Sequence, residues 1–435
     1  MNDSHSSVIA SAKKFFSGTL LSRVMGMVRD LSMAFCFGGA PQVAAFMVAY
    51  RLANLLRRLF GESALQGGFV PHFELLRNQN EAEAVRFYRD LKLSMILIVG
   101  AIIALGMLFC GLFSSDILFM MLLMLPGVLF LTLYALDSAV LQCGKKYFLS
   151  ASAPALFNLV WIVSAFALRQ WEIRSAMFAL SASIFFAFGA QWWVTARPVI
   201  RWSRSIAKTA LQPFSPEVRA LFKPFSYGLI GIGASQINSA LDALFAAWSH
   251  PSGPAYLWYA IRIQQLPLAL LGIALANALL PPLSRAAQAG SWERYQELLQ
   301  KALRKCTALL LPCMVGMILF AEFGVSLLYQ HGAFLKSDAL ATSRCLQAYA
   351  LGLVPTAYVL LLANGFYARK EYHWPMRCSL ISIVSNVVLN TLFVFGFSWG
   401  PSSIALATSL SSFLNCLLLY KRSVRRDFSD LKSGS

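Results

Sequence analysis

The residues best suited to chemistry in this chain are arginines set into an apolar stretch between Lys14 and Pro71. That stretch holds five arginines against two acids: Arg23, Arg29, Arg51, Arg57 and Arg58, with Asp30 and Glu62. Its apolar background is long enough to lie in a bilayer, where an arginine at mid-depth costs about 2.5–3.5 kcal/mol. The guanidinium groups must therefore face protein or water, and their planar forks suit phosphate and pyrophosphate. The stretch predicts anion binding within a membrane.

Helical geometry predicts that part of this charge is paired internally. Two groups share a helix face at 100° per residue: Arg23 with Asp30, and Arg51 with Arg58 and Glu62. One interpretation is that these ion pairs only support helix packing. Against it, the stretch keeps a positive surplus, and Arg29 and Arg57 lie off both faces. Together with Arg262 from later in the chain, they are the predicted anion contacts.

A second group of polar residues lies in the other half of the chain. It consists of Asp242, Asn386, Asn390 and Thr408, with the two asparagines four residues apart on one expected helix. One carboxylate among neutral oxygens is a plausible site for a small hard cation such as sodium. The alternative is a set of hydrogen bonds between helices. Asp137 and Glu322 are lone acids in apolar segments, expected near loops or in local pairs.

Enzymatic chemistry has little support in the sequence. The five histidines lie in expected tails or loops, and the eight cysteines are scattered singly, without CxxC spacing. No GxSxG, P-loop or HExxH motif is present. We therefore expect a protein that is not an enzyme and has no cofactor other than a coupling ion.

The elements that position these residues are predicted to be transmembrane helices. The 435 residues are 58% hydrophobic and 13% charged, with net charge +18 and mean hydropathy +0.61, which excludes an ordinary soluble domain. The apolar segments predict an all-α polytopic membrane protein with about twelve spans: 11–38, 41–68, 88–112, 116–142, 150–169, 176–196, 222–248, 255–281, 301–329, 338–367, 377–397 and 402–421.

The distribution of basic residues predicts the orientation of the spans. Of the 37 lysines and arginines, 27 lie in the N-terminal tail, the C-terminal tail and alternate loops, and three lie in the loops on the opposite side. Positively charged loops face the cytoplasm, so both termini are expected there.

An internal repeat predicts two lobes of six helices each. Positions 211 residues apart match in Arg51 and Arg262, and again in Pro71 and Pro282. We expect an N-lobe at 1–210, containing the cationic hairpin 15–71, and a C-lobe at 211–435. Six helices per lobe is an even number, so the lobes would be parallel repeats related by a pseudo-two-fold axis along the membrane normal, an arrangement common in transporters.

Short motifs in this chain resemble those of a known family. Ser22-Arg23-Val-Met-Gly26-Met-Val-Arg29-Asp30 is similar to the S-R-x-x-G-x-x-R-[DE] signature of the MurJ/MviN lipid II flippases, a branch of the multidrug/oligosaccharidyl-lipid/polysaccharide exporter superfamily. Further matches lie along most of the chain: Asn54-Leu-Leu-Arg57-Arg58, Gly61-Glu62, Phe69-Val70-Pro71, Tyr259-Ala260-x-Arg262, Leu266-Pro267, Gly332-x-Phe334 with Asp338, and Gly365-Phe366-Tyr367-Ala368-Arg369.

The resemblance implies a function and a mechanism. Such proteins flip the undecaprenyl-pyrophosphate-linked peptidoglycan precursor, lipid II, across the bacterial inner membrane by alternating access. Their cavity arginines correspond here to Arg23, Arg29, Arg57 and Arg262. The sodium site of some members is similar to Asp242, Asn386, Asn390 and Thr408. The implied partners are lipid II, membrane lipids and cell-wall synthesis proteins, with no nucleic acid.

This chain departs from the family pattern in three places. Ala44 stands near the start of the second helix, and Ile261 precedes Arg262, where members often carry acids. The resemblance also implies fourteen helices, against the twelve expected here, so either the lipid tail lies against other surfaces or the headgroup and tail are handled differently. Two alternatives therefore stay open: a cation-coupled exporter of drugs or other lipid-linked oligosaccharides, and a cell-wall scaffold that transports nothing.

Overall fold

The computed structural model describes residues 5–60, 62–206 and 211–433, and all of its regular elements in these ranges are helices. Within them, side chains at 5–13, 56–60, 62–68, 205–206, 222–235 and 424–433 lie outside the description. The chain divides into two compact units: Met1–Phe37 with Ala45–Ala240, and Gly38–Ala44 with Leu241–Ser435. The boundary falls inside a helix at residue 240, whereas the sequence placed the lobe boundary at 210.

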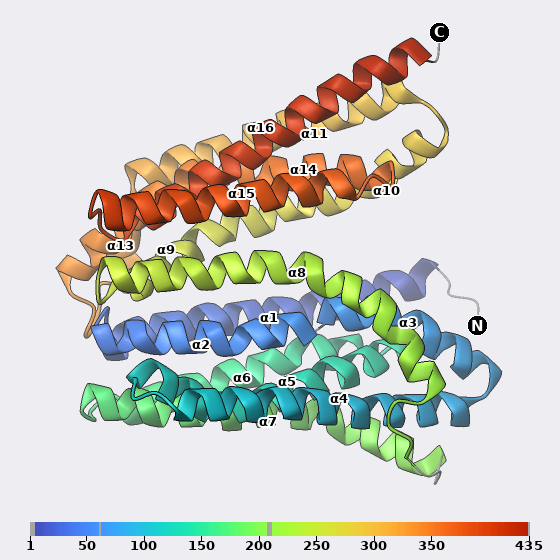
Figure 1. Cartoon of the computed structure of the whole chain (residues 1–435), viewed down its shortest axis with the longest axis horizontal. Helices are drawn as coiled ribbons and strands as arrows, with labels where there is room; N and C mark the ends of the chain where they lie inside the picture. The colour runs from blue at the N-terminus through green and yellow to red at the C-terminus, as the bar shows by residue number, and fades with distance from the viewer. Residues whose placement is uncertain (1–4, 61, 207–210, 434–435) are drawn as a thin grey trace. The chain divides into compact units, whose positions relative to one another are not determined.

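Helices α1 to α7 lie wholly or mostly in the first unit. In chain order they are α1 (His5–Phe37), α2 (Pro41–Phe60), α3 (Glu62–Gln79), α4 (Glu81–Gly111), α5 (Asp116–Cys143), α6 (Tyr147–Leu168) and α7 (Ile173–Ile206) (Figure 1). α8 (Pro216–Ser249) begins in this unit and ends in the second.

The second unit contains interrupted helices. Its elements are α9 (Gly253–Pro267), the π-helix η1 (Leu268–Ile273), α10 (Ala274–Gln288), α11 (Trp292–Leu319), α12 (Ala321–Tyr329), α13 (Lys336–Leu351), α14 (Leu353–Ala368), α15 (His373–Thr391), η2 (Leu392–Gly396) and α16 (Ser402–Ser433). Pro267 immediately precedes η1, and π-helical turns are often found at functional sites.

The described residues support about twelve membrane spans. Nine helical segments are long and apolar enough to cross a bilayer, and each matches one predicted span. The other three predicted spans correspond to α1, α2 and α8, which carry the arginine hairpin and Asp242. All-α architecture is therefore confirmed.

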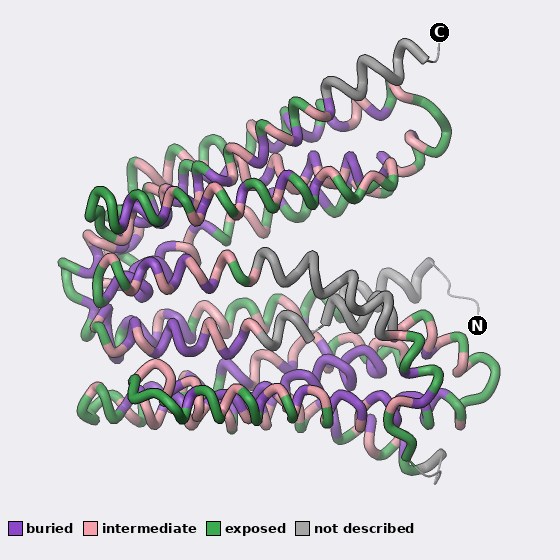
Figure 2. The backbone as a smooth tube through the Cα atoms, in the orientation of Figure 1, coloured by how far each residue is buried: buried purple, intermediate pink, exposed green. Residues whose placement is uncertain are grey.

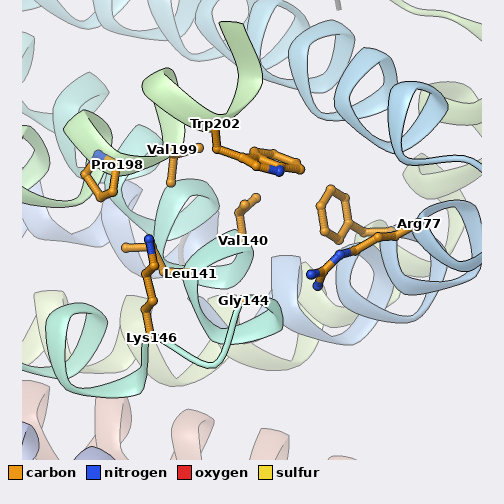
Figure 3. Close-up of a pocket in the computed structure, with 9 residues that line it drawn as sticks. Arg77, Val140, Leu141, Gly144, Lys146, Pro198, Val199 and Trp202 are labelled. Carbon is orange, nitrogen blue, oxygen red and sulfur yellow. The ribbon is translucent and has the colours of Figure 1, made fainter. Parts of the chain in front are cut away.

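Several helices differ in extent from the predicted spans. The span 41–68 covers α2 and part of α3, and Gly61 between them lies outside the described residues. The span 301–329 is broken at Phe320, which separates α11 from α12. The span 176–196 is too short, because α7 continues through Pro198 to Ile206. The added residues of α7 include Val199 and Trp202, which pack in one apolar cluster with Val140 of α5. Figure 3 shows these side chains around a small cavity, whose volume is about 120 Å³.

Close helix packing holds the first unit together. α1 packs along α6, and α5 packs against α4 and α7. Gly18 makes the α1–α6 approach possible, because a Cβ there would meet the Phe148 carbonyl oxygen at 2.9 Å. The ring of Trp161 on α6 meets Phe46 and Tyr50 of α2 edge-on, at 5.4 and 4.8 Å between centroids. Buried and exposed residues alternate along these helices (Figure 2), as expected where one face meets protein and the other lipid.

In the second unit α16 packs against α13, α14 and α15, and α10 packs against α14. The turn before α2 also belongs to this unit. Asp338 accepts a hydrogen bond from the backbone N–H of Gly39 (3.3 Å) and another from the Tyr256 hydroxyl (3.0 Å). Gly38 has a left-handed φ of +65°, and a Cβ there would lie 2.3 Å from the Ala333 carbonyl oxygen. Only glycine fits this position without displacing the backbone.

Candidate functional site

The signature segment of α1 faces α6 and is organised around one side chain, Asn158. The Asn158 amide donates to the carbonyl oxygen of Ser22 (3.2 Å). Its side-chain oxygen accepts from Nη1 of Arg29 (3.1 Å). Gly26 lies between them, and a Cβ there would be 3.6 Å from the Asn158 amide nitrogen. The spacing of these three α1 residues is therefore explained by helix packing, since they recur every three to four residues on one face.

Arg29 is buried, with 7% of its surface exposed, and its guanidinium is engaged from several sides. Its Nε and Nη2 atoms donate to Oδ1 of Asp30 at 3.0 and 2.7 Å. The guanidinium carbon also lies 4.7 Å from the ring centroid of Trp161, a cation–π contact. Asp30 is thus paired with its neighbour Arg29. The acidic partner predicted for Arg23 is therefore seen on the adjacent arginine, Arg29.

Arg23 differs from Arg29 in its exposure and in its contacts. It is exposed, and no described residue forms a hydrogen bond or ion pair with it. The surrounding α1 residues Leu20, Leu21 and Val24 are also exposed, at 50%, 45% and 52%. On a helix that spans the membrane, as predicted for α1, an exposed guanidinium among apolar side chains requires water or an anionic ligand.

Of the remaining predicted arginines, the structure describes the side chains of Arg51 and Arg262. Nη1 of Arg51 donates to the Ser239 carbonyl oxygen of α8 (3.2 Å). The side chains of Arg57, Arg58 and Glu62 lie outside the described residues, and so does their predicted pairing. In the second unit Arg262 on α9 is half-buried. Its guanidinium carbon lies 4.4 Å from the Trp258 ring centroid, and Nη1 is 3.4 Å from the Gln265 side-chain oxygen.

The structure brings the four predicted cation-site residues together in the second unit. Asp242 of α8 accepts from the Asn390 amide at Oδ1 (2.9 Å) and from the Thr408 hydroxyl at Oδ2 (3.3 Å). The Asn390 amide also lies 2.8 Å from the side-chain oxygen of Asn386, and the Asn386 amide lies 3.4 Å from Thr408 Oγ1. Asp242, Asn386 and Asn390 are 6%, 1% and 0% exposed.

One atom of this cluster is unsatisfied. The side-chain oxygen of Asn390 is buried and accepts no hydrogen bond from the described residues. A buried oxygen without a donor is unfavourable, and it is also what an oxygen-coordinated cation would use. No group of three or more His, Cys, Asp or Glu side chains within the described residues could hold a metal, so a cation here would depend on amide and hydroxyl oxygens beside one carboxylate.

The sequence analysis missed the setting of Asp137. Its carboxylate is 0% exposed. It accepts from the Tyr88 hydroxyl (2.6 Å), from Lys92 Nζ (3.3 Å) and from Trp192 Nε1 (3.0 Å). The expectation of a position near a loop or in a local pair missed these partners, because all three donors come from α4 and α7. The sequence does show an acid, Asp137, and a lysine, Lys92, in apolar segments. It does not show that their side chains meet.

Comparison with solved structures defines the class of protein. The fold matches that of an inward-facing multidrug resistance MATE family transporter of the MOP superfamily, with a TM-score of 0.74 at 13% identity over 98% of this chain and 100% of that one. A structure described as lipid II flippase MurJ, inward closed conformation, matches with a TM-score of 0.80 at 25% identity, over 95% of this chain and 88% of that one. The fold is that of a multi-pass membrane transporter.

The sequence comparisons identify the family within that class. The profile named "Lipid II flippase MurJ" matches residues 33–434, so the chain belongs to this family. A probable lipid II flippase MurJ from Chlamydia muridarum is 34% identical over 96% of this chain and 79% of its own length. One from Vibrio cholerae is 31% identical over 93% and 80%. The resemblance seen in the signature motifs is confirmed, and the family consists of transporters rather than enzymes.

Proposed function

We propose that this protein flips lipid II from the cytoplasmic to the periplasmic leaflet of a bacterial inner membrane by alternating access. The family match over most of the chain supports the substrate. The single structural observation that carries the proposal is Arg23, an exposed guanidinium with no described partner on an otherwise apolar helix face. A pyrophosphate group is the anion that would satisfy it. Both termini are proposed to be cytoplasmic, from the distribution of basic residues.

The four candidate arginines are proposed to act in different ways. Arg23, Arg57 and Arg262 are proposed to contact the pyrophosphate directly. Arg29 is proposed to position α1 against α6, because its guanidinium already binds Asp30 and Asn158. The two arginines of the α1 motif would then have separate roles: Arg23 is available to the ligand, and Arg29 is held by protein groups.

Complementation tests the function. Cells depleted of their own flippase should be rescued by the wild-type chain, and lipid II should become accessible on the periplasmic side. Arg23→Ala should reduce rescue, because a charge-assisted contact of about 1.5–3 kcal/mol corresponds to roughly a ten- to hundredfold change in affinity. Arg169→Ala, at an exposed arginine just beyond α6, is the matched control and should rescue fully.

Three outcomes would contradict parts of the proposal. Rescue by Arg23→Ala at the level of Arg169→Ala would refute the direct contact of Arg23 with the pyrophosphate. Failure of the wild-type chain to rescue would refute lipid II flipping and favour export of another substrate. Rescue of growth without any periplasmic exposure of lipid II would favour a scaffold role in cell-wall synthesis.

We further propose that the Asp242 cluster binds sodium as a coupling ion. The carboxylate, the unsatisfied oxygen of Asn390 and the hydroxyl of Thr408 fit a hard monovalent cation in donor chemistry. Sodium chloride, compared with potassium chloride, should raise the thermal stability of the purified protein, by about 2.7 kcal/mol at a hundredfold excess over Kd. Asp242→Asn should abolish that difference, whereas Asp338→Asn, at another buried acid of this unit, should keep it. Equal stability in both salts would refute the sodium site without touching the flipping proposal.

A further inference from the structure

A large cavity lies between α4, α5 and α7 in the first unit, away from the signature face of α1. Its volume is about 770 Å³, within the range of small-molecule sites. Three cations line it: Arg89 and Lys92 from α4, and Arg204 from α7. The remaining wall is largely apolar and includes Leu93 and Ile96 of α4. A mixed cationic and apolar wall predicts an amphipathic anion as the ligand.

The charges and the apolar residues are separated along the helix axis. α4 and α7 run antiparallel, since Trp202 donates to Glu81 (2.9 Å) while Lys92 Nζ lies 5.6 Å from the Trp192 ring centroid. Arg89 near the start of α4 and Arg204 near the end of α7 therefore lie toward the same end of the helix bundle. The apolar residues of α4 that line the cavity follow deeper along the helix. This order matches a phospholipid, whose phosphate lies at the surface and whose acyl chains point inward.

Lys92 is pre-positioned at the junction between the two zones. Its ammonium donates to the Tyr88 hydroxyl (2.9 Å) and to both carboxylate oxygens of Asp137 (3.3 and 3.4 Å), and its side chain is 17% exposed. Of the described residues that line the cavity, three are basic and none is acidic, and Asp137 pairs with Lys92. A lysine already held in place loses little conformational entropy when a ligand binds.

We propose that this cavity binds one anionic glycerophospholipid, with the phosphate at Arg89, Lys92 and Arg204 and an acyl chain along Leu93 and Ile96. The distribution of basic loops predicts that this end of α4 faces the cytoplasm, and basic pockets between helices on that side attract anionic lipid headgroups. Free phosphate would leave the apolar wall hydrated, so a lipid is the better match. The proposal needs only a membrane location and does not depend on what the protein transports.

Binding of short-chain lipids to the purified full-length protein in detergent tests the headgroup contact. Dioctanoyl phosphatidylglycerol should bind more tightly than dioctanoyl phosphatidylcholine, as counted by native mass spectrometry. Arg204→Gln should weaken phosphatidylglycerol binding about three- to fivefold, the effect of an exposed ion pair. Arg201→Gln is the matched control, because Arg201 is exposed on the same helix and does not line the cavity. It should bind as wild type does.

A second pair of variants tests the acyl-chain contact. Ile96→Ser should weaken the binding of phosphatidylglycerol, while Leu97→Ser, at an exposed neighbour outside the cavity, should not. Equal binding of the two lipids, or equal effects of Arg204→Gln and Arg201→Gln, would overturn the proposal. Full competition by millimolar inorganic phosphate, with no effect of Ile96→Ser, would also overturn it and assign a phosphate site instead.

Discussion

Removing the carboxylate of Asp30 is the sharpest test of how Arg29 is held. Asp30→Ala deletes the acceptor of two Arg29 hydrogen bonds, at 3.0 and 2.7 Å, and leaves the guanidinium against α6. The side chains of the pair are 9% and 5% exposed, so bulk water has little access to the guanidinium that remains. Breaking a buried ion pair from one side costs about 3–5 kcal/mol, because the remaining charge stays in a low-dielectric site.

The stability loss of Asp30→Ala can be compared with the losses of two other variants. Asn158→Ala removes one hydrogen bond to the same guanidinium and should cost less, about 1.5–3 kcal/mol. The double variant Arg29→Met with Asp30→Leu removes both charges and should recover most of the stability, since buried ion pairs are roughly neutral against apolar replacements. Flipping should nevertheless fall in the double variant if Arg29 positions α1.

The assay is reversible unfolding of the purified protein in detergent, followed by helical content. Asp116→Ala is the control, because its 2.8 Å ion pair with Arg174 is exposed on both sides. Its effect should be much smaller than that of Asp30→Ala. If the two variants unfolded at the same denaturant concentration, Arg29 would not depend on Asp30 and its burial would have another cause.

Two further predictions concern the turn before α2 and its contacts in the second unit. Gly38→Ala should destabilise this unit by more than Gly290→Ala. Both glycines have left-handed φ values, +65° and +66°, where alanine costs about 1–2 kcal/mol. At Gly38 the added Cβ would also clash with the Ala333 carbonyl oxygen, whereas at Gly290 it would meet no atom of the described residues within 4 Å. Thermal unfolding of the two variants measures the difference, and equal losses would contradict it. Tyr256→Phe should cost about 1–3 kcal/mol through the lost bond to Asp338, and an unchanged unfolding midpoint would show that this bond contributes nothing.

Local patterns were enough to predict much of this protein. Apolar segment length identified the membrane helices, because a span must satisfy its own backbone hydrogen bonds and needs about twenty apolar residues. The i,i+4 spacing of Asn386 and Asn390 predicted a shared helix face, and the structure places both beside Asp242. The motif of α1 was sufficient to suggest the family that the comparisons confirm.

Helix boundaries were harder to predict than helix existence. α7 was expected to end at 196, but it continues to Ile206 because its last turns find apolar neighbours on α5. Hydropathy likewise does not register the break at Phe320, because the residues on both sides of it are apolar.

The sequence alone determined that unusual charge lies in the membrane, but tertiary structure decided which charges are available. Arg23 and Arg29 belong to one motif and looked interchangeable as anion ligands. Asn158, 129 residues from Arg29 in sequence, holds Arg29 and leaves Arg23 exposed. Lys92 and Asp137 also meet only across two helices. The physical reason is that helical periodicity defines which residues share a face, whereas the partner of that face depends on the register between helices.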